Sequence, residues 1–374
     1  MMMNPFVTKG YVSAKYFCDR EKESQQLLRE LENGNDVALV ATRKIGKSGL
    51  IFHCFDAFDL KKDYNLFFID FYSVGTLREM VYMMSRAIVN ALAPKGAVWL
   101  QQFSAAVRSM AFVMTTDLTG LPKLNIQLGD IREPQVSLEE IFQYLEHSER
   151  PSIVAIDEFQ QIAKFPEKNT EALLRTYIQQ CHRSKFIFAG SQRHLMGDIF
   201  TSAVHPFYQS ASVMHLGPID KEKYRAFACH HFAEANKTLE PNVIDELYNR
   251  FEGITWYMQK TLNTLFLLPS ETQRYGIDEM EEAIQNIIDT NDFTYAEKML
   301  QLPEKQKELL LAICQEGKAT KITSVNFVKR HKIYSTSTVQ SAGNGLLDKE
   351  LITLENGQYF VYDKFFELWL RQNY

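Results

Sequence analysis

The chain has 374 residues, of which 45% are hydrophobic and 23% charged, and its formal net charge is −5. This composition is typical of a globular protein with room for two or three domains, and the negative balance excludes a protein that coats nucleic acid through bulk positive charge. The five cysteines are scattered and form no C-x-x-C pair, so they predict neither a disulfide framework nor a zinc site. The sequence contains no apolar run of the roughly 18 residues that span a membrane and no apolar signal core in "MMMNPFVTKG". We therefore expect a cytoplasmic protein without membrane contact.

Strands and helices alternate over the first half of the chain. Short apolar runs predict buried strands at 36–41, 64–72, 151–159, 184–191 and 211–217, and helices are predicted after Lys47 and over 77–92. Such alternation is typical of a parallel sheet covered on both faces. Residues 95–140 are less regular: "VWLQQFSAAVRSMAFVM" reads as a helix and 123–130 as an extra strand. This insertion either contacts a partner or only adds packing.

The alternation stops after residue 217. Four successive amphipathic segments predict a small helical domain. Three further helical segments precede two strand-like runs around Asn356-Gly357, which is a hairpin signal. Three helices and a hairpin indicate a winged helix-turn-helix. The expected fold class is α/β, with a parallel-sheet core at 1–217, a helical lid at 218–298 and a winged helix-turn-helix at 299–374.

The segment "VALVATRKIGKSGL" (37–50) nearly fits the phosphate-binding loop G-x-x-x-x-G-K-[ST], with Ala41 in place of the first glycine. A predicted strand precedes it and a predicted helix follows it, which is the context that such a loop requires. Backbone N–H groups would bind phosphates, Lys47 would contact the β- and γ-phosphates, and Ser48 would bind Mg²⁺. If position 41 needs a positive φ, alanine strains it by roughly 1–2 kcal/mol; the alternative is a chance G-K-S. The predicted nucleotide-binding residues of the loop are Arg43, Lys44, Ile45, Gly46, Lys47, Ser48 and Gly49.

Polar residues follow two of the other predicted strands. In "SIVAIDEF", Asp157 is expected to hold Mg²⁺ and Glu158 to act as general base on the attacking water. The alternative is that this pair caps the next helix, and Asp70 is a weaker metal candidate. In "FIFAGSQRH", the side chains of Ser191 and Gln192 are placed to contact the γ-phosphate or orient water. Arg193 is either catalytic or a solvated arginine.

Together these residues resemble the archaeal-type ATPases, which belong to the AAA+/STAND group of P-loop NTPases. The resemblance covers nearly the whole chain, through "YFCDREKESQQLLRELENGNDVALVATRKIGKSGL", "AIDEFQ", "FAGSQRHLM", "EGITWYMQ" and "VYDKFFELWLR". It implies that Phe17, Arg20 and Glu21 lie near the adenine side of an ATP site. It also makes Arg43 and Lys44 the basic pair of the loop.

The resemblance extends to the lid, where Gly253 and Tyr257 fit the family's Gly-x-Pro-Tyr segment and Tyr257 is expected at the nucleotide. Three departures accompany it. Ala41 replaces the loop glycine, Thr255 replaces the lid proline, and Gln209 stands where relatives often carry an arginine. If that arginine senses the γ-phosphate, this chain either uses Arg193 instead or hydrolyses ATP slowly.

Residues 317–349 of the winged helix carry a local charge of +5, because they hold six basic residues against Asp348. Such an asymmetry is typical of a face that contacts DNA, although winged helices in this group also serve as protein-contact modules. The residues expected at DNA are Lys329, Arg330, Lys332, Thr336 and Thr338.

Two functions fit these patterns. The first is a Mg²⁺-dependent ATPase that converts ATP to ADP and phosphate and drives a conformational switch, which controls DNA or a protein partner, including a second copy of the chain. The second is a non-catalytic regulator that binds DNA or protein when nucleotide is bound. The complete set of loop and acidic residues favours the first, and the departures at 41 and 209 favour the second.

Overall fold

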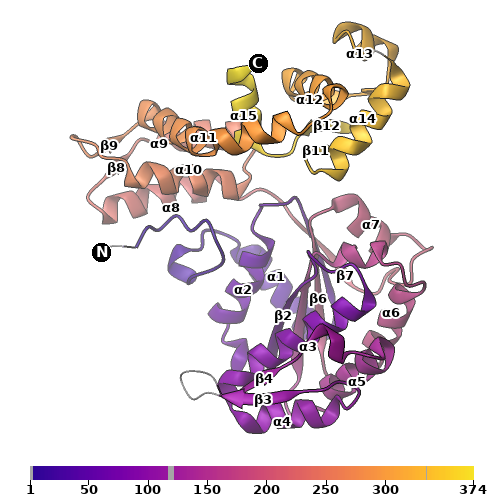
Figure 1. Cartoon of the computed structure of the whole chain (residues 1–374). Coiled ribbons are helices and arrows are strands. Elements are labelled where there is room, and N and C mark those ends of the chain that lie inside the picture. Colours follow the sequence, from indigo (N-terminus) through magenta and orange to yellow (C-terminus); the bar gives the residue numbers. More distant parts are fainter. Residues whose placement is uncertain (1–2, 117–121, 334) are drawn as a thin grey trace. The chain divides into compact units, whose positions relative to one another are not determined.

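The computed structural model describes residues 3–116, 122–333 and 335–374. The chain forms two compact units (Figure 1). One comprises Lys9–Pro218, and the other comprises Ile219–Tyr374 together with the N-terminal segment that ends at Thr8. In the described parts of the chain, no helix is long and apolar enough to cross a membrane.

The first unit is built on a five-stranded parallel sheet, in the order β2-β5-β6-β1-β7. The predicted parallel sheet is therefore confirmed, and each strand lies within a predicted apolar run. The chain passes from β1 to β2 at the far edge of the sheet and later returns. Because β5, β6 and β1 are neighbouring parallel strands, the loops that follow them meet at the same end of the sheet. The strands are β1 (Val37–Ala41), β2 (Asn65–Asp70), β5 (Ser152–Asp157), β6 (Lys185–Gly190) and β7 (Ser212–Leu216).

Helices cover both faces of this sheet, as Figure 1 shows. Alternate residues of β1 point to opposite faces, so Val37 and Leu39 pack in one buried cluster and Ala38 and Val40 in another. The first cluster is closed by α1 (Glu21–Glu32) and α2 (Lys47–Ala57). The second is closed by α3 (Leu77–Leu92), α5 (Pro134–His147), α6 (Thr170–Gln180) and α7 (Arg193–Thr201).

The insertion at 95–140 packs into the second cluster through Leu100, Phe103 and Ile131. This supports the interpretation that it adds packing. It contains α4 (Ala97–Ala106) and an antiparallel hairpin of β3 (Val113–Thr116) and β4 (Pro122–Asn125). The expected single helix over 98–114 is wrong in its second half, because Ser109 donates two hydrogen bonds to the Glu140 carboxylate, at 2.9 and 2.5 Å, and holds the chain in a turn.

The second unit begins with the four predicted helices, α8 (Lys221–Glu234), α9 (Pro241–Arg250), α10 (Thr255–Leu267) and α11 (Ile277–Leu300). The short strands β8 (Thr238–Leu239) and β9 (Arg274–Tyr275) pair between them. The N-terminal segment, which the sequence assigned to the first domain, packs here. Phe6 is fully buried, with its ring 5.5 Å from that of Phe232 and 5.8 Å from that of Phe266.

The C-terminal part of the second unit is the predicted winged helix. Its helices are α12 (Glu304–Glu316), α13 (Val325–Arg330) and α14 (Thr336–Asp348), and its sheet joins β10 (Ala319–Thr320), β12 (Gln358–Val361) and β11 (Ile352–Glu355). Asn356 and Gly357 both have positive φ angles, 51° and 76°, as a tight hairpin turn requires. The last helix, α15 (Lys364–Asn373), is tied to α11 by a 2.7 Å hydrogen bond from the Trp369 indole to Asp292.

Candidate functional site

The predicted phosphate loop connects β1 to α2 at the carboxyl end of the sheet. Helix α2 starts at Lys47, and Gly46 before it has a φ of 103°, a conformation that glycine adopts without strain. Gly46 offers no side chain to cap the helix, so the first-turn N–H groups of α2 have no side-chain cap from the N-cap position, as a phosphate-binding helix start requires. Ala41 is the last residue of β1 and is fully buried. It is not among the positive-φ residues, so the strain considered for this position is absent.

The loop carries its strain elsewhere, at Lys44, which has a φ of 66°. A left-handed conformation costs a residue with a side chain roughly 1–2 kcal/mol. Arg43 extends over the ring of Tyr72, with its guanidinium carbon 5.1 Å from the ring centre. Tyr72 follows β2 and was not predicted as a site residue. The sequence signal for Tyr72 is limited to an aromatic residue two positions after Asp70, the acidic residue that ends β2.

The structure brings Ser48 and Asp157 together. The Ser48 hydroxyl donates a 2.5 Å hydrogen bond to the Asp157 carboxylate, which lies at the end of β5. Burial raises the pKa of Asp157, and the neighbouring Lys47 ammonium and Ser48 hydroxyl counteract this effect. A buried carboxylate beside a hydroxyl is a set of hard oxygen ligands, which suits Mg²⁺. These two residues therefore fit the predicted metal pair.

Glu158 is held at the same place in a left-handed conformation, with a φ of 53°. Its carboxylate accepts hydrogen bonds from the Ser191 hydroxyl at 2.7 Å and from the Gln160 amide at 2.6 Å. The Lys47 ammonium lies 3.8 Å from its other oxygen. The carboxylate therefore does not cap the short helix that begins at Phe159. Gln160 is fully buried, and the sequence pattern gave no indication of its role.

Arg20 supports the loop from the protein side. Its guanidinium is buried and donates to the carbonyl oxygens of Ile45, at 3.4 Å, and Gly217, at 2.8 Å, and it pairs with Glu23 at 2.9 Å. The resemblance placed Arg20 near the adenine. In the structure its hydrogen bonds connect the loop to the end of β7, so its contribution to a nucleotide would act through the loop backbone.

Phe17 forms an aromatic stack beside α2. Its ring lies 4.3 Å from that of His53, nearly parallel, and 5.8 Å from that of Tyr11. A Cβ atom placed on Gly49 would meet the Phe17 ring at 3.5 Å, so position 49 accepts alanine and little more. Phe17 therefore lies against Gly49, near the start of α2, and its place beside a base stays a prediction.

The other predicted site residues are placed less directly. Gln192 precedes α7 and is half-buried, and Asp70 lies next to Asp157 across β2 and β5. Arg193 begins α7, but its side chain lies outside the described part of the structure. Gln209 leads into β7 at its amino end, which is the edge of the sheet opposite the phosphate loop. An arginine there would not reach the loop of its own chain, so the Gln209 departure says nothing about hydrolysis within one subunit.

Tyr257 belongs to the second unit, on α10. Its ring is buried, and its hydroxyl donates to the Tyr362 carbonyl at 3.2 Å and accepts from the Lys364 N–H at 3.2 Å. These bonds connect α10 to the end of the winged helix. Thr255 is the first residue of α10, a position where proline is also favourable, so this departure does not disturb the helix.

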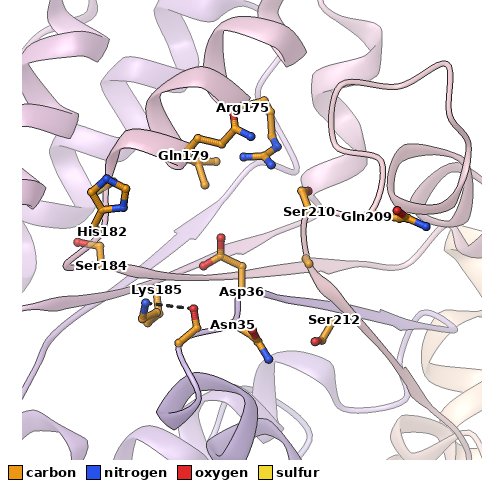
Figure 2. Close-up of a pocket in the computed structure, with 14 residues that line it drawn as sticks. Asn35, Asp36, Arg175, Gln179, His182, Ser184, Lys185, Gln209, Ser210 and Ser212 are labelled. Carbon is orange, nitrogen blue, oxygen red and sulfur yellow. Dashed lines mark hydrogen bonds between the residues drawn. The ribbon is translucent and has the colours of Figure 1, made fainter.

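A second, polar cavity of about 430 Å³ lies at the amino ends of β1, β6 and β7 (Figure 2). The Asp36 carboxylate points into it and accepts a 2.8 Å hydrogen bond from the Phe186 N–H. Burial raises the pKa of Asp36 to about 6, although Lys185 and Arg175 lie nearby. This cavity contains none of the predicted nucleotide-site residues.

Residues 17–261, more than half of the chain, match the family described as "ATPase domain predominantly from Archaea". The chain belongs to this family. Residues 293–372 match a family described as "Probable winged helix domain". Membership supports ATP binding and hydrolysis at the level of the family, and a search of curated proteins finds no significant match.

Solved structures of similar fold span nearly the full length of this ATPase-family chain. The Walker-type ATPase PABY2304 of Pyrococcus abyssi is 19% identical, with a TM-score of 0.64, and the match covers 98% of this chain and 99% of that one. The ORC2 protein of Aeropyrum pernix, determined in ADPNP–ADP complexes, is 12% identical with a TM-score of 0.56 and coverage of 99% and 98%. The ORC1 protein of Aeropyrum pernix, determined in complex with DNA, is 15% identical with a TM-score of 0.53 and coverage of 96% and 93%. At these identities the similarity concerns the fold alone.

Proposed function

We propose that this chain binds ATP with Mg²⁺ and hydrolyses it to ADP and phosphate, and that the nucleotide state controls its binding to DNA. The observation that carries the proposal is the 2.5 Å contact between Ser48 and Asp157, because it unites the phosphate loop with the acidic strand end. Loop and acid are 109 residues apart in the sequence, so a chance G-K-S would have no reason to meet this carboxylate.

The residues suggest how each would act. Ser48 and Asp157 would hold Mg²⁺, which supplies positive charge to the β- and γ-phosphates when bound. Lys47 and the first-turn N–H groups of α2 would hold the phosphate oxygens. When Lys47 turns to phosphate, the Glu158 carboxylate loses this partner 3.8 Å away and keeps Ser191 and Gln160. Glu158 would then accept a proton from the attacking water.

The second candidate is a regulator that binds nucleotide without cutting it. It is favoured by the two hydrogen bonds that hold Glu158, because a carboxylate fixed by Ser191 and Gln160 has less freedom to reach a water. The first function predicts ATP turnover and the second does not, whereas both predict nucleotide binding.

The deciding experiment measures ATP turnover and nucleotide affinity in the wild type and in Glu158→Gln, with Glu149→Gln as an exposed control. We expect turnover in the wild type and the control, and a loss of at least about 100-fold in Glu158→Gln with affinity retained. Lys47→Ala should lose affinity under either function. Nucleotide binding without turnover in the wild type would favour the second candidate, and absence of binding would refute both.

The proposed DNA contact uses the exposed face of α14. Thr336 is exposed, whereas Thr338 is half-buried and its hydroxyl bonds to Ser335 at 2.8 Å. The Arg330 guanidinium pairs with Glu316 at 2.6 Å, which weakens its attraction for phosphate. Lys329 is exposed and is the more favourable cation.

The test is fluorescence anisotropy with duplex DNA at several salt concentrations. Lys329→Ala and Lys332→Ala should each weaken binding and lower the salt slope by about 1. Lys168→Ala is a charge-matched control on an exposed residue of the first unit. Equal binding by all four proteins would exclude this face and favour a protein partner.

A further inference from the structure

The last turn of α8, in the second unit, gathers three side chains of metal-binding type. His230, His231 and Glu234 each offer one ligand atom, and these atoms lie within 4.8 Å of one another. The His231 Nδ1 atom is 3.1 Å from one Glu234 oxygen, and the His230 Nε2 atom is 3.7 Å from the other. The helix explains the grouping, because residues three and four positions before Glu234 lie on the same side as its carboxylate.

These distances approach the spacing within a zinc site. Zinc bonds to nitrogen and oxygen of about 2.0–2.1 Å in a tetrahedron place the ligand atoms roughly 3.3 Å apart. The two measured separations lie on either side of this value. These separations run to different Glu234 oxygens, and the three ligand atoms lie within 4.8 Å of one another, so rotation of the side chains has to draw them together around one ion, with a fourth position left for water.

The three ligands differ in exposure in a way that suits metal entry. The side chain of His231 is only 3% exposed, and the Phe227 ring meets it edge to face with the ring centres 4.5 Å apart. His230 is 66% exposed and Glu234 is 30% exposed. One imidazole is thus fixed by packing, while the other two groups are accessible to an ion from solvent.

The donor types select the metal. Two imidazoles and a carboxylate suit zinc and related first-row divalent ions, whereas Mg²⁺ prefers an all-oxygen set. Cys229 precedes the pair but does not join it. Its thiol donates instead to the Leu239 carbonyl oxygen, at 3.9 Å.

We propose that His230, His231 and Glu234 form a binding site for Zn²⁺ at the end of α8. The site is separate from the nucleotide site in chemistry and lies in the other compact unit. An ion there would cross-link three side chains of the last turn of α8. The turn would then fray less where the helix passes into the following loop. Metal binding would therefore stabilise the second unit.

The simpler interpretation is two intrahelical pairs of histidine with glutamate, which are common on helix surfaces. A zinc site predicts that one Zn²⁺ binds per chain, whereas histidine–glutamate pairs alone predict no stoichiometric Zn²⁺ binding. The experiment titrates Co²⁺ and Zn²⁺ into the full chain without nucleotide, with excess Mg²⁺ present to occupy oxygen sites. Visible absorption reports Co²⁺, competition with a chromophoric chelator gives the Zn²⁺ affinity, and thermal unfolding reports stabilisation.

We expect one Zn²⁺ per chain and a rise in melting temperature with Zn²⁺ concentration. His230→Ala and Glu234→Gln should each weaken Zn²⁺ binding at least about tenfold, since even partners outside the ligand set contribute 10–100-fold. Controls are His182→Ala, an exposed histidine in the first unit, and Cys229→Ser, and both should bind as the wild type does. Equal binding by His230→Ala and the wild type, or no stoichiometric binding, would overturn the proposal.

Discussion

Gly190 ends β6 directly before Ser191, whose hydroxyl donates to Glu158, so the substitution Gly190→Ala tests the packing that supports the acidic site. A Cβ atom on Gly190 would lie 2.4 Å from the Gln160 Oε1 atom and 2.4 Å from the Met196 Cγ and Sδ atoms. Normal contacts are about 1 Å longer, so both side chains must move. Gln160 and Met196 are fully buried and cannot swing into solvent.

The expected loss follows from overpacking a closed site. One extra methyl group in a well-packed core typically destabilises a protein by about 1–3 kcal/mol. We expect the upper half of this range, because Gln160 also donates the 2.6 Å hydrogen bond to Glu158. Loss of a hydrogen bond to a charged group costs about 1.5–3 kcal/mol of stability. ATP turnover should fall together with stability, since Glu158 would lose the Gln160 amide and keep only the Ser191 hydroxyl and the Lys47 ammonium as partners.

The assay is urea unfolding followed by circular dichroism, with ATP turnover measured on the same preparations. Gly197→Ala is the matched control, because a Cβ atom there meets nothing within 4 Å and the residue lies inside α7. That substitution should raise the unfolding free energy by about 0.5–1 kcal/mol. An unchanged stability and turnover in Gly190→Ala would refute the packing argument and the positioning of Glu158 by Gln160.

Three further outcomes are expected. Burial raises the pKa of Asp36 from 3.8 to about 6, so the folded state binds this proton more tightly and the unfolding free energy falls as the pH rises through that interval. Asp36→Asn should remove this pH dependence and raise the unfolding free energy by about 1–3 kcal/mol at pH 7.5. Urea titrations at a series of pH values would contradict this if the unfolding free energies of the wild type and Asp36→Asn changed with pH in the same way. Lys44→Gly should relieve the left-handed strain and raise the unfolding free energy by about 0.5–1 kcal/mol. ATP affinity should drop, because the loop loses a cation. A lower stability in thermal unfolding would show that the φ of 66° at Lys44 is not strained. The Ser335 hydroxyl accepts the Thr338 N–H at 3.2 Å as the N-cap of α14, so Ser335→Ala should lower stability by about 1 kcal/mol, and a loss below about 0.3 kcal/mol in urea unfolding would argue against the cap.

Some of the candidate site could be predicted without the structure because its signals are local. The G-K-S triplet after an apolar run and Asp157-Glu158 at the end of another are both short patterns with a fixed chemical meaning. A parallel sheet brings its strand ends to one edge, so these two patterns had only one place to meet. Ser48 and Asp157 are in contact for that reason.

Other parts of the site depend on packing between distant segments. The strain expected at Ala41 is absent because β1 continues through it, and the strain lies three residues later at Lys44. Gln160 acts on Glu158 only because Gly190 leaves space on the adjacent strand. Neither relation has a sequence signature, since each depends on which side chains share a small buried volume.

The sequence by itself determined the five strands of the core, the order of helices after residue 217 and the winged-helix hairpin, since these follow from periodicity and turn chemistry that act over a few residues. Only the tertiary structure decided that the segment carrying Phe6 packs with α8 and α10, that Arg20 fastens the loop backbone, and that Gln209 faces the opposite edge of the sheet. The physical reason is burial. An aromatic ring or a guanidinium goes to the site where its surface and its donors are satisfied, and that site is created by distant segments, such as Asn263, which bonds to the Phe6 carbonyl 257 residues away in the chain.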